Sequence, residues 1–84
     1  MWNDEKAEQL GAVLRRLRND SGLSQESLAY QAGITKNQLQ LIEAGRSTGR
    51  KDDAGPSNPR MATLVGLAEV LGVSVAHLMA ESRL

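Results

Sequence analysis

Near the beginning of the chain, apolar residues recur at the spacing of one face of a helix. They stand at positions i, i+3, i+4 and i+7 and are Leu10, Val13, Leu14 and Leu17. Charged side chains fill most of the other positions, and Gly22 is a natural helix end because glycine adopts positive φ without strain. The pattern predicts an amphipathic helix from about Asp4 to Ser21.

The stretch SQESLAYQAGITKNQLQLIEAG predicts two shorter helices joined by a tight turn. We expect them at about Ser24–Ala32 and Thr35–Ala44, since serine and threonine are favoured first caps. Gly33 and Gly45 stand where glycines commonly end helices. Two helices connected by a short glycine-containing turn form the DNA-binding helix-turn-helix unit.

The rest of the chain divides into a loop and two further helices. Residues 46–58 lack any hydrophobic period and contain glycine and proline, which predicts an inserted loop that is mobile at its tip. Asn58 is expected to cap a fourth helix with Pro59 in its first position, and Ser74 a short fifth one. No β pattern or internal repeat is visible. We therefore predict an all-α domain of five helices spanning residues 1–84.

Composition limits the kinds of site that the chain can build. Hydrophobic residues make up 40% and aromatic residues only 2%, so the core must be aliphatic. The chain has no cysteine, which excludes disulfides and thiolate metal sites. His77 is the single histidine, leaving little material for a metal site or a catalytic base. We expect no cofactor, no metal and no enzymatic activity.

The sequence also carries no sign of a membrane or an export signal. Its apolar runs are too short to cross a bilayer. The first five residues lack the basic start and apolar stretch of a signal peptide. We expect a cytoplasmic protein.

Charge is balanced overall but uneven along the chain. Ten basic residues offset ten acidic ones, so general basicity gives no argument for nucleic acid. The segment from Lys36 to Lys51 nevertheless has a local excess of three positive charges, with Glu43 as its one acidic residue. The acidic Asp4, Glu5 and Glu8 are expected to lie away from any phosphate.

A helical wheel at about 100° per residue separates the two faces of the third helix. Leu39 and Ile42 fall together and must point into the core. The opposite surface holds four residues: Lys36, Asn37, Gln40 and Leu41. Lysine, asparagine and glutamine suit the edges of bases in the major groove, and a leucine could meet a thymine methyl. An ordinary amphipathic helix has the same period, but the two capped helices, the glycine turn and the basic loop favour DNA.

Seven short motifs, in order, resemble the Cro and phage-repressor family of helix-turn-helix regulators, often called XRE-like. The motifs are Leu14-Arg15 with Leu17-Arg18, GLSQ at Gly22–Gln25, Leu28-Ala29, GIT at Gly33–Thr35, IEAG at Ile42–Gly45, Asn58-Pro59 and LAEVLGVSV at Leu67–Val75. Together they cover about residues 10 to 79. The resemblance implies a lambda-repressor-like five-helix fold and binding of double-stranded DNA.

The resemblance also implies roles for single residues. Lys36, Asn37 and Leu41 match positions that reach base edges, with Gln40 alongside. Gln25 matches a glutamine that touches a phosphate and braces the start of the recognition helix. Arg18 and Glu43 match a mostly buried structural ion pair between the first and third helices. Further phosphate contacts are expected from Thr35, Arg46, Arg50, Lys51 and Asn58, and the alternative for the loop is a solvated insertion.

A homodimer is expected, because one short helix offers few base contacts against a genome of competing sites. Two copies on half-sites about 34 Å apart would remove that limit. Val75, Met79 and Leu84 are the predicted interface, although these residues could instead complete the core. Trp2 is a large apolar residue outside the core pattern, and the sequence leaves its role open.

Two functions remain in competition. The leading one is a dimeric, sequence-specific transcription regulator, resembling restriction-modification controller proteins, toxin-linked antitoxins or stand-alone repressors. The alternative is a protein-interaction module on the same fold, such as an antitoxin that covers a toxin. Zero net charge and the apolar Leu41 favour this alternative slightly.

Overall fold

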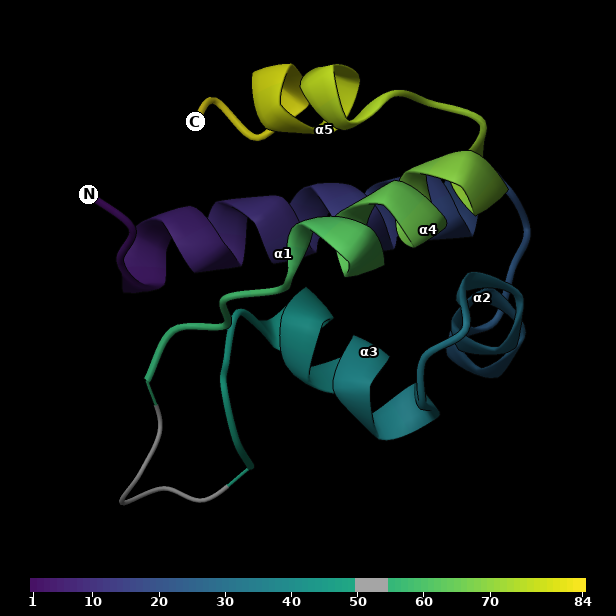
Figure 1. The fold of residues 1–84 in the computed structure, drawn as a ribbon, viewed down its shortest axis with the longest axis horizontal. Coiled ribbons are helices and arrows are strands. Elements are labelled where there is room, and N and C mark those ends of the chain that lie inside the picture. The colour runs from purple at the N-terminus through teal and green to yellow at the C-terminus, as the bar shows by residue number, and fades with distance from the viewer. Residues whose placement is uncertain (50–54) are drawn as a thin grey trace.

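The computed structural model describes residues 1–49 and 55–84 and shows five helices in that part of the chain (Figure 1). Their bounds are α1 at Asp4–Asp20, α2 at Gln25–Ala32, α3 at Lys36–Ala44, α4 at Met61–Leu71 and α5 at Val75–Glu81. Helix α1 packs on both α3 and α5, which lie on opposite sides of it in Figure 1. Helix α2 bridges α3 and α4. The predicted all-α, five-helix class is confirmed.

The core is aliphatic, as the composition requires. Its buried residues come from the first four helices and from Leu78 in α5; Leu10, Leu14, Leu28, Leu39 and Leu67 are among those with at most 1% exposure. The stripe predicted for α1 supplies two of them, Leu10 and Leu14, together with Val13, while Leu17 is half-buried against the same cluster. Burying the leucines contributes on the order of 1.5–3 kcal/mol each.

Local signals fix most helix ends. Ser24, Thr35 and Ser74 each accept a hydrogen bond from a backbone N–H in the first turn of the helix that follows. Gly33 and Gly45 have φ of 77° and 73°, the left-handed region that glycine tolerates best. These predicted caps are confirmed.

The predicted start of the fourth helix is wrong. Asn58 and Pro59 are not helical, and α4 begins at Met61 after an extended Arg60 that makes no side-chain cap bond. Tertiary bonds explain the delay: the N–H of Ser57 donates to the carbonyl of Gly45 at 3.0 Å, which holds the preceding segment extended beside α3.

The connection between α3 and α4 has an outgoing limb after α3 and a returning limb that passes the end of α3 again before α4 begins. Residues 46–49 and 55–58 are not helical, as expected of the loop, while its tip lies outside the described residues. Among described residues, the structure has one β-type pairing, an antiparallel bridge between Arg46 and Pro56 that the sequence pattern did not predict. None of the described helices alone has the length and apolarity to cross a membrane; α4 and α5 meet that test only as a pair bent by 91°.

Candidate nucleic-acid interface

The turn between α2 and α3 is short and held at both ends. Gly33 ends α2, and the N–H of Ile34 returns to the carbonyl of Ala29 at 2.9 Å. Thr35 and Gln38 then form a capping box at the start of α3. The Thr35 hydroxyl accepts from the Gln38 N–H at 3.0 Å, and the Gln38 side chain accepts from the Thr35 N–H at 2.8 Å. The direction of α3 relative to α2 is therefore set by local bonds.

Helix α3 separates a buried face from an exposed polar face. Leu39, Ile42 and Glu43 are buried on the side toward α1 and α2. Lys36, Asn37 and Gln40 are exposed, as predicted. Leu41 departs from the expectation, since it is half-buried rather than fully on the exposed face. The reason is its place beside the returning segment before α4, with which it lines a common hollow.

The buried charge on α3 is neutralised by α1. Arg18 donates from Nε to one carboxylate oxygen of Glu43 at 2.7 Å and from Nη2 to the other at 3.1 Å. A third guanidinium N–H donates to the carbonyl of Leu23 at 2.9 Å. The two side chains are 10% and 2% exposed, so this pair is a structural link between α1 and α3. It is the pair that the resemblance implied.

Gln25 lies at the start of α2 and joins the same network. Its side-chain amide donates to Glu43 at 2.9 Å. Because Glu43 stands near the end of α3, this brace holds the last turn of that helix and not its start, which corrects the expectation. The correction follows from the packing of α1, since Arg18 brings both Glu43 and the Leu23 carbonyl to the beginning of α2.

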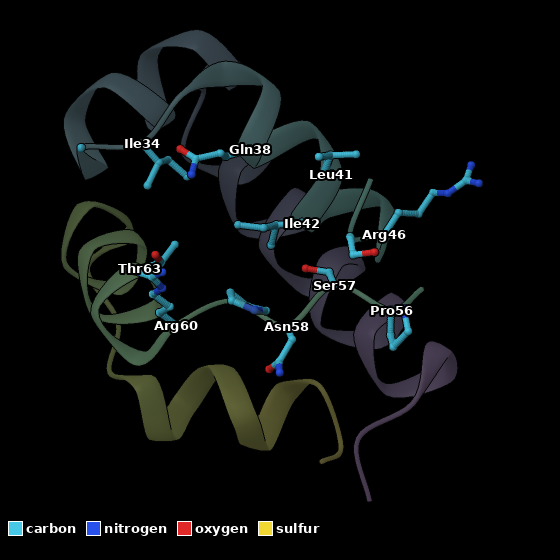
Figure 2. Close-up of a pocket in the computed structure, with 13 residues that line it drawn as sticks. Ile34, Gln38, Leu41, Ile42, Arg46, Pro56, Ser57, Asn58, Arg60 and Thr63 are labelled. Carbon is cyan, nitrogen blue, oxygen red and sulfur yellow. The ribbon is translucent and has the colours of Figure 1, made fainter. Parts of the chain in front are cut away.

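A hollow of about 590 Å³ runs beside α3 (Figure 2). Its apolar part comes from Ile34, Leu41 and Ile42, and its other wall comes from the returning segment and the start of α4. Arg46 and Arg60 line it from the two limbs of the connection. In Figure 2 the Arg46 side chain extends away from the hollow. Arg60 is exposed and was not predicted, because the fourth helix was expected to begin at Pro59 and to include it.

The two limbs are bound to each other close to α3, and we call residues 45–47 and 55–57 the neck. The N–H of Ser47 donates to the carbonyl of Gly55 at 3.0 Å, and the Gly55 N–H donates back to the Ser47 hydroxyl at 3.2 Å. The indole of Trp2 donates to the carbonyl of Ser57 at 2.6 Å. Arg46 and the exposed Asn58 therefore have defined backbone positions next to α3, whereas the predicted contacts Arg50 and Lys51 lie outside the described residues.

The acidic beginning of α1 is closer to this surface than expected. Asp4 and Glu8 line a second, smaller hollow together with Gly45 and Arg46. A Cβ added to Gly45 would lie 2.8 Å from the Cα of Glu8, so the end of α3 is in tight contact with α1. Asp4 and Glu8 therefore lie beside Arg46, one of the predicted phosphate contacts, because α1 crosses the end of α3.

The predicted dimer residues differ in exposure. Val75 and Met79 are half-buried against the core, whereas Leu84 is 41% exposed. The largest apolar exposures on α4 are Met61 at 64% and Val65 at 39%, one helical turn apart. The sequence reasoning did not single these two out, although their spacing was a visible signal. Within the described ranges, no three His, Cys, Asp or Glu side chains group as metal ligands.

Comparison with known proteins adds to this geometry. A family model described as a helix-turn-helix domain matches residues 9–81. The uncharacterized HTH-type transcriptional regulator y4dJ of Sinorhizobium fredii is 34% identical over 70 residues, which cover 83% of this chain and 78% of that protein.

Solved structures of regulators have a similar fold. The clp gene regulator ClgR from Corynebacterium glutamicum superposes with a TM-score of 0.78 at 28% identity, covering 93% of this chain and 72% of ClgR. The restriction-modification controller protein C.AhdI from Aeromonas hydrophila gives 0.71 at 28% identity, covering 86% and 94%. SinR, a master regulator for biofilm formation solved in complex with DNA, gives 0.65 at 31% identity, covering 83% and 97%.

Proposed function

Because this chain belongs to the helix-turn-helix domain family, we propose that it is a transcription regulator that binds a pseudo-palindromic DNA operator as a homodimer. One observation carries the proposal. Helix α3 buries Leu39, Ile42 and Glu43 while it exposes Lys36, Asn37 and Gln40, and the α2–α3 turn and the Arg18–Glu43 pair hold it in place. A rigid helix with exposed hydrogen-bonding side chains is what the major groove accepts.

We assign base recognition to the exposed face of α3. Lys36 can donate to guanine O6 and N7, while Asn37 and Gln40 can each pair with adenine through two hydrogen bonds. Leu41 keeps part of its side chain accessible and would contact a thymine methyl from the edge of that face. Each good two-bond contact is worth about 1–3 kcal/mol of discrimination between bases.

Phosphate contacts are assigned to residues around α3. Thr35 and Gln25 lie at the starts of α3 and α2. Arg46 is exposed within the neck, and Asn58 is exposed directly after it. Arg50 and Lys51 are proposed for the same role from the sequence. Such contacts set the position of a protein on the duplex without reading its sequence. For Gln25, the amide that now donates to Glu43 would have to be shared with the phosphate.

The homodimer supplies two reading helices. Half-sites one helical turn apart, about 34 Å, would place both α3 helices on one side of the duplex. We propose Val75, Met79 and Leu84 as contact residues, with Leu84 offering the most accessible apolar surface of the three.

In vitro selection of bound sequences from random duplexes tests the proposal. The expected result is an enriched site with two-fold symmetry and half-sites one helical turn apart. The variants Lys36→Ala and Asn37→Ala are compared with Glu69→Ala, an exposed α4 residue, as the matched control. The first two should relax the preference at single base positions while the control retains it. An unchanged preference and affinity in both α3 variants would remove α3 as the reading element.

A second function has one observation in its favour. A chain of the solved SinR protein/SinI protein complex is also similar, with a TM-score of 0.67 at 30% identity over 83% of this chain and 59% of that chain. Exposed Met61 and Val65 on α4 would suit a protein partner, for example a toxin covered by an antitoxin. Stable co-purification with a protein encoded beside this one, together with DNA binding that does not respond to salt, would favour this function.

A further inference from the structure

We infer that Trp2 is a positioning residue for phosphate contacts: its indole N–H fixes the neck so that Arg46 and Arg60 are held on the two limbs that flank the hollow beside α3. The inference rests on the proposed DNA binding and adds a residue that the sequence left without a role. It concerns only residues that the structure describes.

The indole makes a hydrogen bond that joins the segment before α1 to the neck. Its Nε1 donates to the carbonyl oxygen of Ser57 at 2.6 Å, across 55 positions of sequence. Ser57 is 4% exposed, and its own N–H donates to the carbonyl of Gly45 at 3.0 Å. The ring is half-buried against the hydrophobic core. A single buried residue, Ser57, is therefore bonded through its carbonyl to Trp2 and through its N–H to the end of α3.

The two hydrogen bonds of Ser57 help to fix the backbone positions of the two arginines. On the outgoing limb, the Arg46 N–H donates to the carbonyl of Leu41 at 2.9 Å, and Arg46 pairs with Pro56 in the antiparallel bridge. On the returning limb, Arg60 is three positions after Ser57 and accepts the first helical hydrogen bond of α4, from Leu64 at 3.1 Å. Without the indole bond, the bonds between the limbs remain, but the carbonyl of Ser57 loses its link to the segment before α1. The neck, and the two arginines on its limbs, would then be held less firmly against the rest of the fold.

The chemistry of the two arginines indicates what they bind. Both are exposed residues at the edge of the same hollow, with the Arg46 side chain extending away from it, and among described residues neither forms an ion pair. Exposed Lys36, the first residue of α3, is a third cation among the residues proposed to meet the duplex. Guanidinium groups match phosphate oxygens in charge and in two-bond geometry. The ligand is therefore the phosphodiester backbone of the duplex whose groove receives α3.

The test measures binding to a mixed-sequence DNA duplex of about three helical turns as a function of salt. The logarithm of the association constant falls with the logarithm of salt by about 0.9 for each phosphate neutralised. Trp2→Phe keeps the ring and removes the N–H donor. We expect its slope to be shallower by about 1–2, with an affinity several-fold lower at low salt. Arg46→Ala/Arg60→Ala should lose about 2 in slope, and adding Trp2→Phe to that pair should change nothing more.

If Trp2 only stabilised the fold, Trp2→Phe would lower the melting temperature and leave the salt slope unchanged. A control variant shows what such a purely structural loss does to DNA binding. Val70→Ala removes half-buried packing at the far end of α4, and it should lower the melting temperature without altering the slope. An unaltered slope in Trp2→Phe, or an equal loss in the arginine-free background, would overturn the inference.

Two further results bear on the inference and keep it distinct from the proposed function. Trp2 is the single tryptophan of the chain, so its indole N–H gives one proton resonance, which should exchange slowly in the wild type. Fast exchange of that proton would show that the bond to Ser57 is absent. It would overturn the proposed role of Trp2 and leave the proposed DNA binding unaffected. A wild-type protein without salt-dependent binding to DNA would instead overturn the proposed function, and the inference with it.

Discussion

Gly11 of α1 lies against the carbonyl of Ile42 in α3, closer than any side chain would allow. A Cβ at this position would be 2.5 Å from the carbonyl oxygen of Glu43 and nearer still to that of Ile42. Glycine in the middle of a helix costs about 1 kcal/mol relative to alanine, so a steric reason is needed for it here. The reason is the close crossing of α1 over the last turn of α3.

Gly11→Ala is expected to destabilise the protein despite the better helix propensity of alanine. The blocking atoms are backbone, so the two helices must separate, and overpacking of this kind costs about 1–3 kcal/mol. Urea unfolding measures the change. Ala12→Val, on the exposed side of α1, is the matched control and should stay within about 0.5 kcal/mol of wild type. A Gly11→Ala protein as stable as wild type would contradict the contact.

Glu43→Gln should be among the most destabilising polar substitutions in this chain. It leaves the guanidinium of Arg18 buried without a counter-charge, for which about 3–5 kcal/mol is typical. The control is Arg16→Met, which breaks the exposed pair with Glu81 at 2.8 Å and should cost less than about 1 kcal/mol. Equal losses in the two variants, by chemical denaturation, would show that burial of the inner pair is not what matters.

Gly33→Ala and Gly45→Ala should differ in cost although both residues have nearly the same backbone conformation. Left-handed φ alone costs an alanine about 1–2 kcal/mol. A Cβ on Gly33 meets nothing within 4 Å, whereas one on Gly45 would lie 2.8 Å from the Glu8 backbone. Thermal melts should therefore rank Gly45→Ala as clearly the less stable. The reverse ranking would mean that α1 can move away from α3 at little cost.

Glu8→Gln should strengthen DNA binding at low salt. Its carboxylate lines the hollow that also contains Arg46, and a negative charge there opposes the approach of phosphate. The expected gain is a few-fold and should shrink as salt rises, because exposed charges are screened over about 8–10 Å. Titration of a labelled duplex at two salt concentrations gives the measurement. Glu5→Gln, on the same helix but not lining that hollow, should give a smaller gain.

Helix ends and exposed helix positions, which depend on a few neighbouring residues, could be predicted from the sequence. The caps Ser24, Thr35 and Ser74 and the helix-ending Gly33 and Gly45 placed both ends of α2 and α3 and the start of α5 to within about a residue. The exposed positions of Lys36, Asn37 and Gln40 followed from helical period alone. These features depend on local backbone geometry, which a short window of sequence determines.

Contacts between residues that are far apart in the chain could not be predicted from the sequence. Asn58-Pro59 is a good local helix start, yet the Ser57 bond to Gly45 keeps that segment extended. The indole of Trp2 finds its acceptor 55 positions away. Leu41 is partly covered by the returning segment, and Glu8 reaches the end of α3 only because α1 crosses it. Each of these depends on how the helices pack, which periodicity does not specify.

The reciprocal bonds between Thr35 and Gln38 have a consequence for the thermodynamics of recognition. The first turn of α3 is already ordered in the free protein, so docking does not have to freeze its backbone. A segment that folds on its target loses several kilocalories of affinity per mole to that ordering, about 2–5 or more. In this protein the entropy cost of ordering the first turn of α3 is incurred when the protein folds, before it meets DNA. Association should thus have the modest heat-capacity change of two preformed surfaces meeting.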